Sequence, residues 1–136
     1  TLAILAVKNG DIAEAEKIYR EGEQILGPSP SLTLSQLHFM ASYCVFLTTQ
    51  NKTETAEKNY KRICMQIPKE VSANELSNQS KAQKDIEAYV LGTYGLFLLN
   101  HKKQGPQAIT HLQAANIRSP SQHWENGITL AKKLAS

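Results

Sequence analysis

Four histidines and two cysteines are the residues of this sequence best suited to metal binding or covalent chemistry. They are His38, His101, His111 and His123, with Cys44 and Cys64. Zinc needs three or four converging ligands, and no two of the histidines stand four residues apart with a third ligand close by. We therefore expect surface or loop histidines, with no bound metal and no cofactor.

The remaining candidates for chemistry also favour a protein that is not an enzyme. Cys44 lies in the apolar run MASYCVFL, where no neighbouring base or cation would favour a thiolate, so we expect a buried structural thiol. The two cysteines form no closely spaced pair, which argues against a disulfide scaffold and favours a reducing compartment. Glutamate pairs such as Glu14 and Glu16 point in different directions on a helix. No phosphate-binding or dinucleotide-binding glycine pattern is present.

The composition is that of one soluble globular domain, which we place at residues 1–136. Hydrophobic residues make up 41% and charged residues 20% of the 136 positions. The longest apolar run, YVLGTYGLFLL at 89–99, is too short to cross a bilayer. We expect an intracellular protein, cytoplasmic by default, with an organelle or the nucleus as alternatives. A start at Thr1 rather than Met is consistent with a fragment of a longer chain.

The formal net charge is +3, and the basic excess lies in the C-terminal half. Its members are dispersed rather than clustered with aromatic residues: Lys102, Lys103, Arg118, Lys132 and Lys133. Dispersed cations are typical of solvated helix faces. A nucleic-acid partner is therefore improbable, and a binder of that class would show a steep salt dependence.

Apolar residues recur at spacings of three and four along most of the chain, which predicts helices and no strands. The expected helices cover about 11–26, 33–50, 53–67, 81–101, 106–119 and 121–135, after a short apolar opening. Residues 69–80 are expected to form a loop or a frayed helix entry. Thr53 is the expected N-cap of its helix, Pro106 fits a first turn, and Ser119 or Ser121 would cap the last helix.

One spacing occurs three times: a small residue is followed four positions later by a large one. The pairs are Ala15 and Tyr19, Ala56 and Tyr60, and Ala108 and Leu112. A small residue allows two helices to cross closely, and the larger one fills the groove to a neighbouring helix. The preceding helices supply their own small residues at Ala3, Ala41 and Gly95.

The run LAILAVKNGDIAEAEKIY, with this spacing, resembles the tetratricopeptide repeat (TPR) family, and ILGPSPSLTLSQLHFMASY is similar to the longer repeats of kinesin light chains. The resemblance implies an all-α, right-handed superhelix of three antiparallel helix pairs at about 1–27, 33–68 and 81–119. A capping helix at about 121–135, anchored by Trp124, would follow. The repeated alanines stand 41 and 52 residues apart rather than the usual 34, so another helical-hairpin solenoid is the alternative.

The same resemblance implies that the first helix of each pair lines a concave surface that binds a protein partner. With Ala41 and Gly95 setting the register, the partner-binding groove would contain Ser35, His38, Ser42, Tyr89, Thr93 and Asn100. These residues suit an apolar peptide or helix better than a charged one. The expected function is that of a non-enzymatic scaffold or adaptor. The alternative is a structural subunit or assembly factor of a larger complex, with an organelle as one possible location of that complex.

Overall fold

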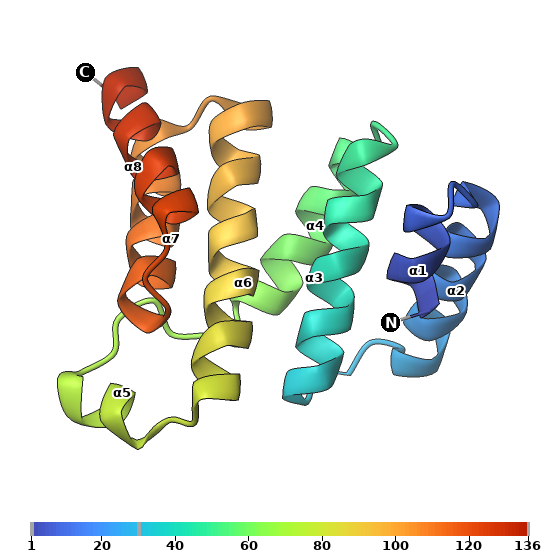
Figure 1. Cartoon of the computed structure of the whole chain (residues 1–136), viewed down its shortest axis with the longest axis horizontal. Coiled ribbons are helices and arrows are strands. Elements are labelled where there is room, and N and C mark those ends of the chain that lie inside the picture. Colours follow the sequence, from blue (N-terminus) through green and yellow to red (C-terminus); the bar gives the residue numbers. More distant parts are fainter. Residues whose placement is uncertain (1, 30, 136) are drawn as a thin grey trace.

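The computed structural model describes residues 2–29 and 31–135, and every regular element in these ranges is helical (Figure 1). The elements are α1 (Leu2–Lys8), α2 (Ile12–Leu26), α3 (Leu34–Thr49), α4 (Thr53–Cys64), α5 (Ala73–Asn78), α6 (Lys81–Phe97), the π-helical turn η1 (Leu98–Lys102), α7 (Gly105–Arg118) and α8 (Gln122–Ala135). Helix α1 packs on α2, α3 on α4, α6 on α7, and α8 on α7. Figure 1 shows these units following one another along the long axis of the molecule. Residue 1, at the start of the first expected pair, lies outside the described residues.

The turns of the first two pairs depend on residues that adopt left-handed backbone angles or cap a helix. Gly10 (φ 79°) turns the chain after α1, and Asp11 accepts a hydrogen bond from the Glu14 amide at the start of α2. Thr33 forms a capping box with Gln36 at the start of α3. The expected N-cap Thr53 is wrong, because Thr53 is already the first helical residue and Lys52 stands at the cap without a side-chain bond.

Residues 69–80, expected to be a loop or a frayed entry, contain a short helix of their own. Helix α5 begins after Ser72, whose hydroxyl accepts a hydrogen bond from the Glu75 amide, and none of its residues is buried. The local cap therefore orders a segment that contributes little to the core. In Figure 1 this segment lies at the edge of the molecule, beside the start of α6.

Helices α6 and α7 make the third pair, and their crossing depends on Gly95. A Cβ at Gly95 would lie 2.7 Å from the Leu112 side chain, so the absence of a side chain permits the close approach. Lys103 adopts a left-handed φ of 54° after η1, and Pro106 lies in the first turn of α7 as predicted.

The large residue of the recurring spacing connects each pair to the next one. Tyr19 lies against the rings of Phe39, Tyr43 and Phe46 on α3. Tyr60 does the same with Tyr94 and Phe97 on α6. The expectation that this side chain fills the groove to the neighbouring helix is confirmed.

Helix α8 covers α6 and α7, as expected of a terminal helix. Trp124 and Ala131 are buried, and Ile128 packs against the core, whereas Ala135 is exposed. Of the two expected caps, Ser121 accepts a hydrogen bond from the His123 amide. Leu130 and Leu134, which the expected apolar face did not include, are exposed. None of the helices in the described ranges is long and apolar enough to cross a bilayer.

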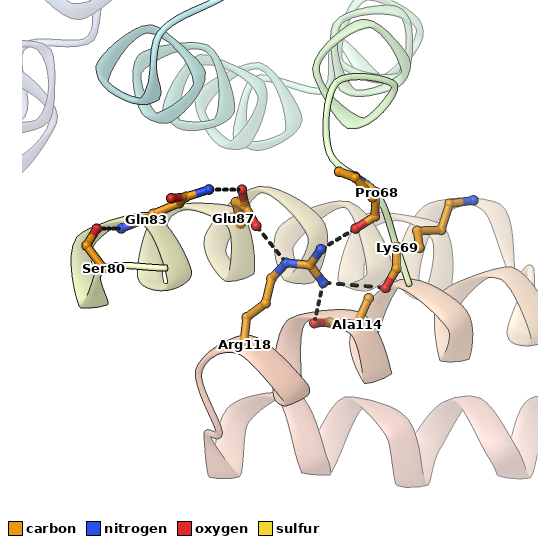
Figure 2. Close-up of polar contacts among 7 residues, drawn as sticks. All are labelled: Pro68, Lys69, Ser80, Gln83, Glu87, Ala114 and Arg118. Atoms are coloured by element: carbon orange, nitrogen blue, oxygen red, sulfur yellow. Dashed lines mark hydrogen bonds and ion pairs between the residues drawn. The ribbon is translucent and has the colours of Figure 1, made fainter. Parts of the chain in front are cut away.

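Arg118 is buried, so its assignment to a solvated face is wrong. Figure 2 shows its guanidinium at the junction of α6, α7 and the chain leaving α4. Its Nε lies 2.9 Å from Glu87 Oε1, and its other nitrogens donate to the carbonyl oxygens of Pro68, Lys69 and Ala114. These partners offset the large desolvation cost of burying the guanidinium charge. Arg118 thereby attaches the start of the 69–80 segment to the third pair.

Candidate partner-binding groove

Two adjacent hollows cross the first helices of the pairs, α1, α3 and α6. One, of about 280 Å³, lies between α3 and α6 and is lined by Val45, Thr48, Thr49, Tyr60, Tyr89, Thr93, Leu96, Phe97, Asn100, His101 and His123. The other, of about 330 Å³, lies between α1 and α3 and is lined by Ile4, Val7, Lys8, Tyr19, Ser42, Val45, Phe46, Thr49 and Tyr89. Both share Val45, Thr49 and Tyr89, so we treat them as one groove and call it the concave groove.

The threonines of the concave groove bond to their own helices. Thr48 donates to the Cys44 carbonyl at 2.9 Å, Thr49 to that of Phe46 at 2.6 Å, and Thr93 to that of Tyr89 at 2.7 Å. Their hydroxyl protons are therefore engaged. Together with the aliphatic and aromatic side chains, they give the groove a largely apolar wall that can still accept hydrogen bonds.

Ser42 is the exception to this pattern. Its side chain is only 5% exposed, and its Oγ has no hydrogen-bond partner among the described residues. It lines the hollow between α1 and α3. Buried polar groups are normally paired, and because the Oγ atom itself is buried, a ligand in the hollow does not reach this hydroxyl unless its neighbours move.

The ionisable side chains that line the groove include basic residues and no carboxylates. Lys8 lines one hollow, and His101 and His123 line the other, whereas no Asp or Glu is among the lining residues of either. A partner carrying negative charge would thus meet no repulsion from carboxylates in the wall.

The structure places the six expected groove residues in different surroundings. Tyr89, Thr93 and Asn100 line the hollow between α3 and α6, and Ser42 and Tyr89 line the one between α1 and α3. His38 lines neither hollow, but its ring lies 5.2 Å from that of Tyr89. Ser35 lies in a separate shallow hollow with Gly22, Ile25, Leu26, Gln36 and Phe39.

The sequence reasoning missed Val45 and Thr49, at the centre of the groove, because it chose Ala41 to set the register of α3. Ala3 precedes Ala15 by 12 residues, and the residue 12 before Ala56 is Cys44, which is fully buried. If Cys44 is aligned with Ala3, then Val45 aligns with Ile4 and Thr49 aligns with Lys8. Ile4 and Lys8 line the hollow between α1 and α3. In the third pair the spacing is 13, and the π-helical turn η1 accommodates the additional residue.

The histidines and cysteines divide between surface and core. His101 and His123 are exposed as expected, but the expectation is wrong for His111, which is buried with its Nδ1 2.9 Å from the Gln107 carbonyl oxygen. Burial lowers the pKa of His111, and this hydrogen bond opposes the shift. Cys44 is buried as predicted; burial raises the pKa of Cys64 to about 12 and that of Cys44 well above its ordinary value. Within residues 2–29 and 31–135, no group of three His, Cys, Asp or Glu side chains could hold a metal ion.

Comparison with known proteins gives one informative relative. A TPR repeat-containing protein of Dictyostelium discoideum is 31% identical to this chain over 112 residues, which are 82% of this chain and 36% of the relative. The chain is thus similar to a TPR protein, and its successive helix pairs form a helical-repeat fold of the TPR type. It spans about a third of the length of this curated relative. No protein-family model and no solved structure matches the present chain. TPR arrays are helical-repeat scaffolds for protein–protein interaction, and the row of first helices α1, α3 and α6 is where such an array has its concave side.

Proposed function

We propose that this chain is a non-enzymatic scaffold or adaptor that binds an apolar peptide or helix of a protein partner in the concave groove. The observation that carries the proposal is the continuity of the two hollows across α1, α3 and α6. A continuous apolar trough of this kind suits a linear segment better than a small ligand, because its surface extends over three helices.

Val45 is the side chain best placed to test the proposal, because it is half-buried and lines both hollows. Peptides would first be selected from a random displayed library against the wild-type chain. Binding would then be measured for Val45→Glu, in which a carboxylate enters the apolar wall. Ile117→Glu is the matched control, since Ile117 is 56% exposed on α7 and lines neither hollow.

We expect Val45→Glu to weaken binding at least about tenfold, roughly 1.4 kcal/mol, and Ile117→Glu to leave it within about twofold. Thermal melts and circular dichroism of both variants would verify that the fold is retained. If selected peptides bound both variants as tightly as the wild type, the concave groove would not be the binding site. The structural-subunit or assembly-factor role would then become the better account if the chain proved insoluble without a permanent partner.

A further inference from the structure

Two histidines from separate elements line the hollow between α3 and α6. They are His101 on η1 and His123 on α8. We propose that protonation of these two imidazoles releases an apolar partner from the concave groove, so that the groove binds at neutral pH and releases its partner in mild acid. The inference rests on the proposed function and adds to it how binding at the same site is regulated.

The wall of this hollow contains no permanently charged side chain. The other described residues that line it have aliphatic, aromatic, hydroxyl or amide side chains, and none of them is Asp, Glu, Lys or Arg. Histidine is the side chain whose charge ordinarily changes between about pH 5 and pH 8. Each proton that His101 or His123 takes up therefore places a positive charge against the occupant, and no carboxylate in the wall offsets it.

Both imidazoles lie against buried aromatic rings, which hold them at the wall. The centre of the His101 ring is 5.3 Å from that of Phe97, and the centre of the His123 ring is 5.2 Å from that of Trp124. Phe97 and Trp124 are themselves buried, so their positions are fixed by the core. A cation within about 6 Å of the centre of an aromatic ring is attracted to it. A protonated imidazole is thus favoured at the wall rather than in open solvent.

The charged groups next to His101 do not supply a free carboxylate. Lys102 and Lys103 follow it in sequence, and Lys102 is paired with Glu57 of α4 at 3.4 Å. Glu57 also lies 3.9 Å from Lys61, so this carboxylate already has two cationic partners. The surroundings of His101 therefore add positive charge rather than compensate it.

The other elements around the hollow contribute no carboxylate to it either. Helix α6 contributes Tyr89 and helix α4 contributes Tyr60, whereas α3 contributes no titratable side chain to this hollow. The titratable residues of α7 are His111 and Arg118, and those of α8 besides His123 are Glu125, Lys132 and Lys133; none of these lines the hollow. Within the described residues, the two imidazoles thus set the charge of this wall near neutral pH.

An apolar occupant binds the neutral form of this wall more tightly than the protonated form. Covering an imidazolium ion with apolar groups removes its water and supplies no counter-charge in return. Because coupling between two bound species is reciprocal, a proton that weakens the peptide is itself released when the peptide binds. Binding is therefore tightest above the pH range in which the two histidines titrate, and it weakens as the pH falls through that range.

The regulation is tested with a peptide selected from the displayed library at about pH 7.5. The peptide is chosen without His, Asp or Glu and is blocked at both ends, so that no group of its own titrates in the range studied. Its affinity is measured at about pH 7.5 and about pH 5.5. The proteins are the wild type, the double variant His101→Gln with His123→Gln, and His38→Gln as the matched control, since His38 lines neither hollow.

We expect acidification to weaken binding about fivefold or more for the wild type and for His38→Gln, and less than about twofold for the double variant. Circular dichroism at both pH values verifies that each protein stays folded during the measurement. A second measurement needs no variant: titration calorimetry in two buffers of different ionisation enthalpy counts the protons exchanged on binding. The wild type should release protons on binding at about pH 6.5, and uptake of protons would contradict the proposal.

The possible outcomes separate this inference from the proposed function. Peptides that bind Val45→Glu as tightly as the wild type would remove both. Peptides that lose affinity for Val45→Glu, but bind the wild type equally well at both pH values or more tightly in acid, would overturn release by protonation while leaving the groove as the site. A loss in acid that persists undiminished in the double variant would overturn the assignment to His101 and His123.

Discussion

The indole ring of Trp124 lies against the position where Gly92 lacks a side chain. A Cβ at Gly92 would come within 2.4 Å of the ring, closer than real atoms approach. Gly92 is on α6 and Trp124 on α8, so this contact holds the terminal helix on the last pair. The small residue and the large ring are thus parts of one packing contact between elements that are distant in sequence.

This contact predicts that Gly92→Ala destabilises the protein by about 1–3 kcal/mol, because the buried ring must move. Alanine favours a helix over glycine by about 1 kcal/mol, which offsets part of this loss. Denaturant unfolding measures the difference, and a Gly92→Ala variant as stable as the wild type would contradict the role of the contact.

Ala56 and Ala108 are fully buried, at the first position of the recurring spacing. We expect Ala56→Leu and Ala108→Leu each to cost about 1–3 kcal/mol of unfolding free energy, because the added atoms overfill the space between helices. Ala82→Leu, at an exposed position of α6, controls for the change in residue type and should be nearly neutral. Thermal melts of the two buried variants that match the wild type would remove the argument from repeat spacing.

Local patterns were enough to predict the helices and their pairing. The spacing of Ala108 and Leu112, for example, predicts that another helix passes close to α7. In the structure that helix is α6, which approaches Leu112 at Gly95. Helix periodicity and turn residues act over a few positions, so they can be interpreted from one sequence. Helix α5 was missed because its six residues show too little periodicity, although Ser72 and Glu75 supply a capping signal.

Long-range polar contacts could not be predicted in the same way. Arg118 and Glu87 are 31 residues apart, and a lone arginine near a helix end resembles any solvated cation until the fold brings a carboxylate to it. His111 was assigned to the surface because its packing against the Tyr94 ring on α6 likewise appears only in the fold. The choice of Ala41 rather than Cys44 to set the register of α3 left Val45 and Thr49 out of the predicted groove, because a cysteine also serves as a small buried residue.

Arg118→Ala should be among the most destabilising single substitutions, at about 3–5 kcal/mol, because it leaves the buried Glu87 carboxylate without its partner. Adding Glu87→Gln to Arg118→Ala should recover part of the loss, since the uncompensated charge is removed. The surface pair of Lys81 and Asp85 provides the comparison: Lys81→Ala should cost no more than about 0.5 kcal/mol. An Arg118→Ala variant as stable as Lys81→Ala would contradict the buried pair.

His111 predicts a loss of stability on acidification. Because burial lowers its pKa in the folded state, the unfolded chain binds a proton at a higher pH than the folded chain. The stabilising contribution is therefore complete above the unfolded value, about pH 6.5, and declines as the pH falls below it. His111→Gln should reduce the difference between melts at about pH 7.5 and about pH 5.5. The same pH dependence in His111→Gln and in the wild type would count against this assignment.

The most direct test of the central claim, that the concave groove binds the partner, is an NMR titration of the ¹⁵N-labelled chain with a selected peptide. The account predicts that the largest amide shift changes cluster at Ser42, Val45, Thr49, Tyr89 and Thr93, which line the groove. Saturable changes centred instead on the exposed Ile117 and Leu130, with the groove amides unmoved, would contradict it.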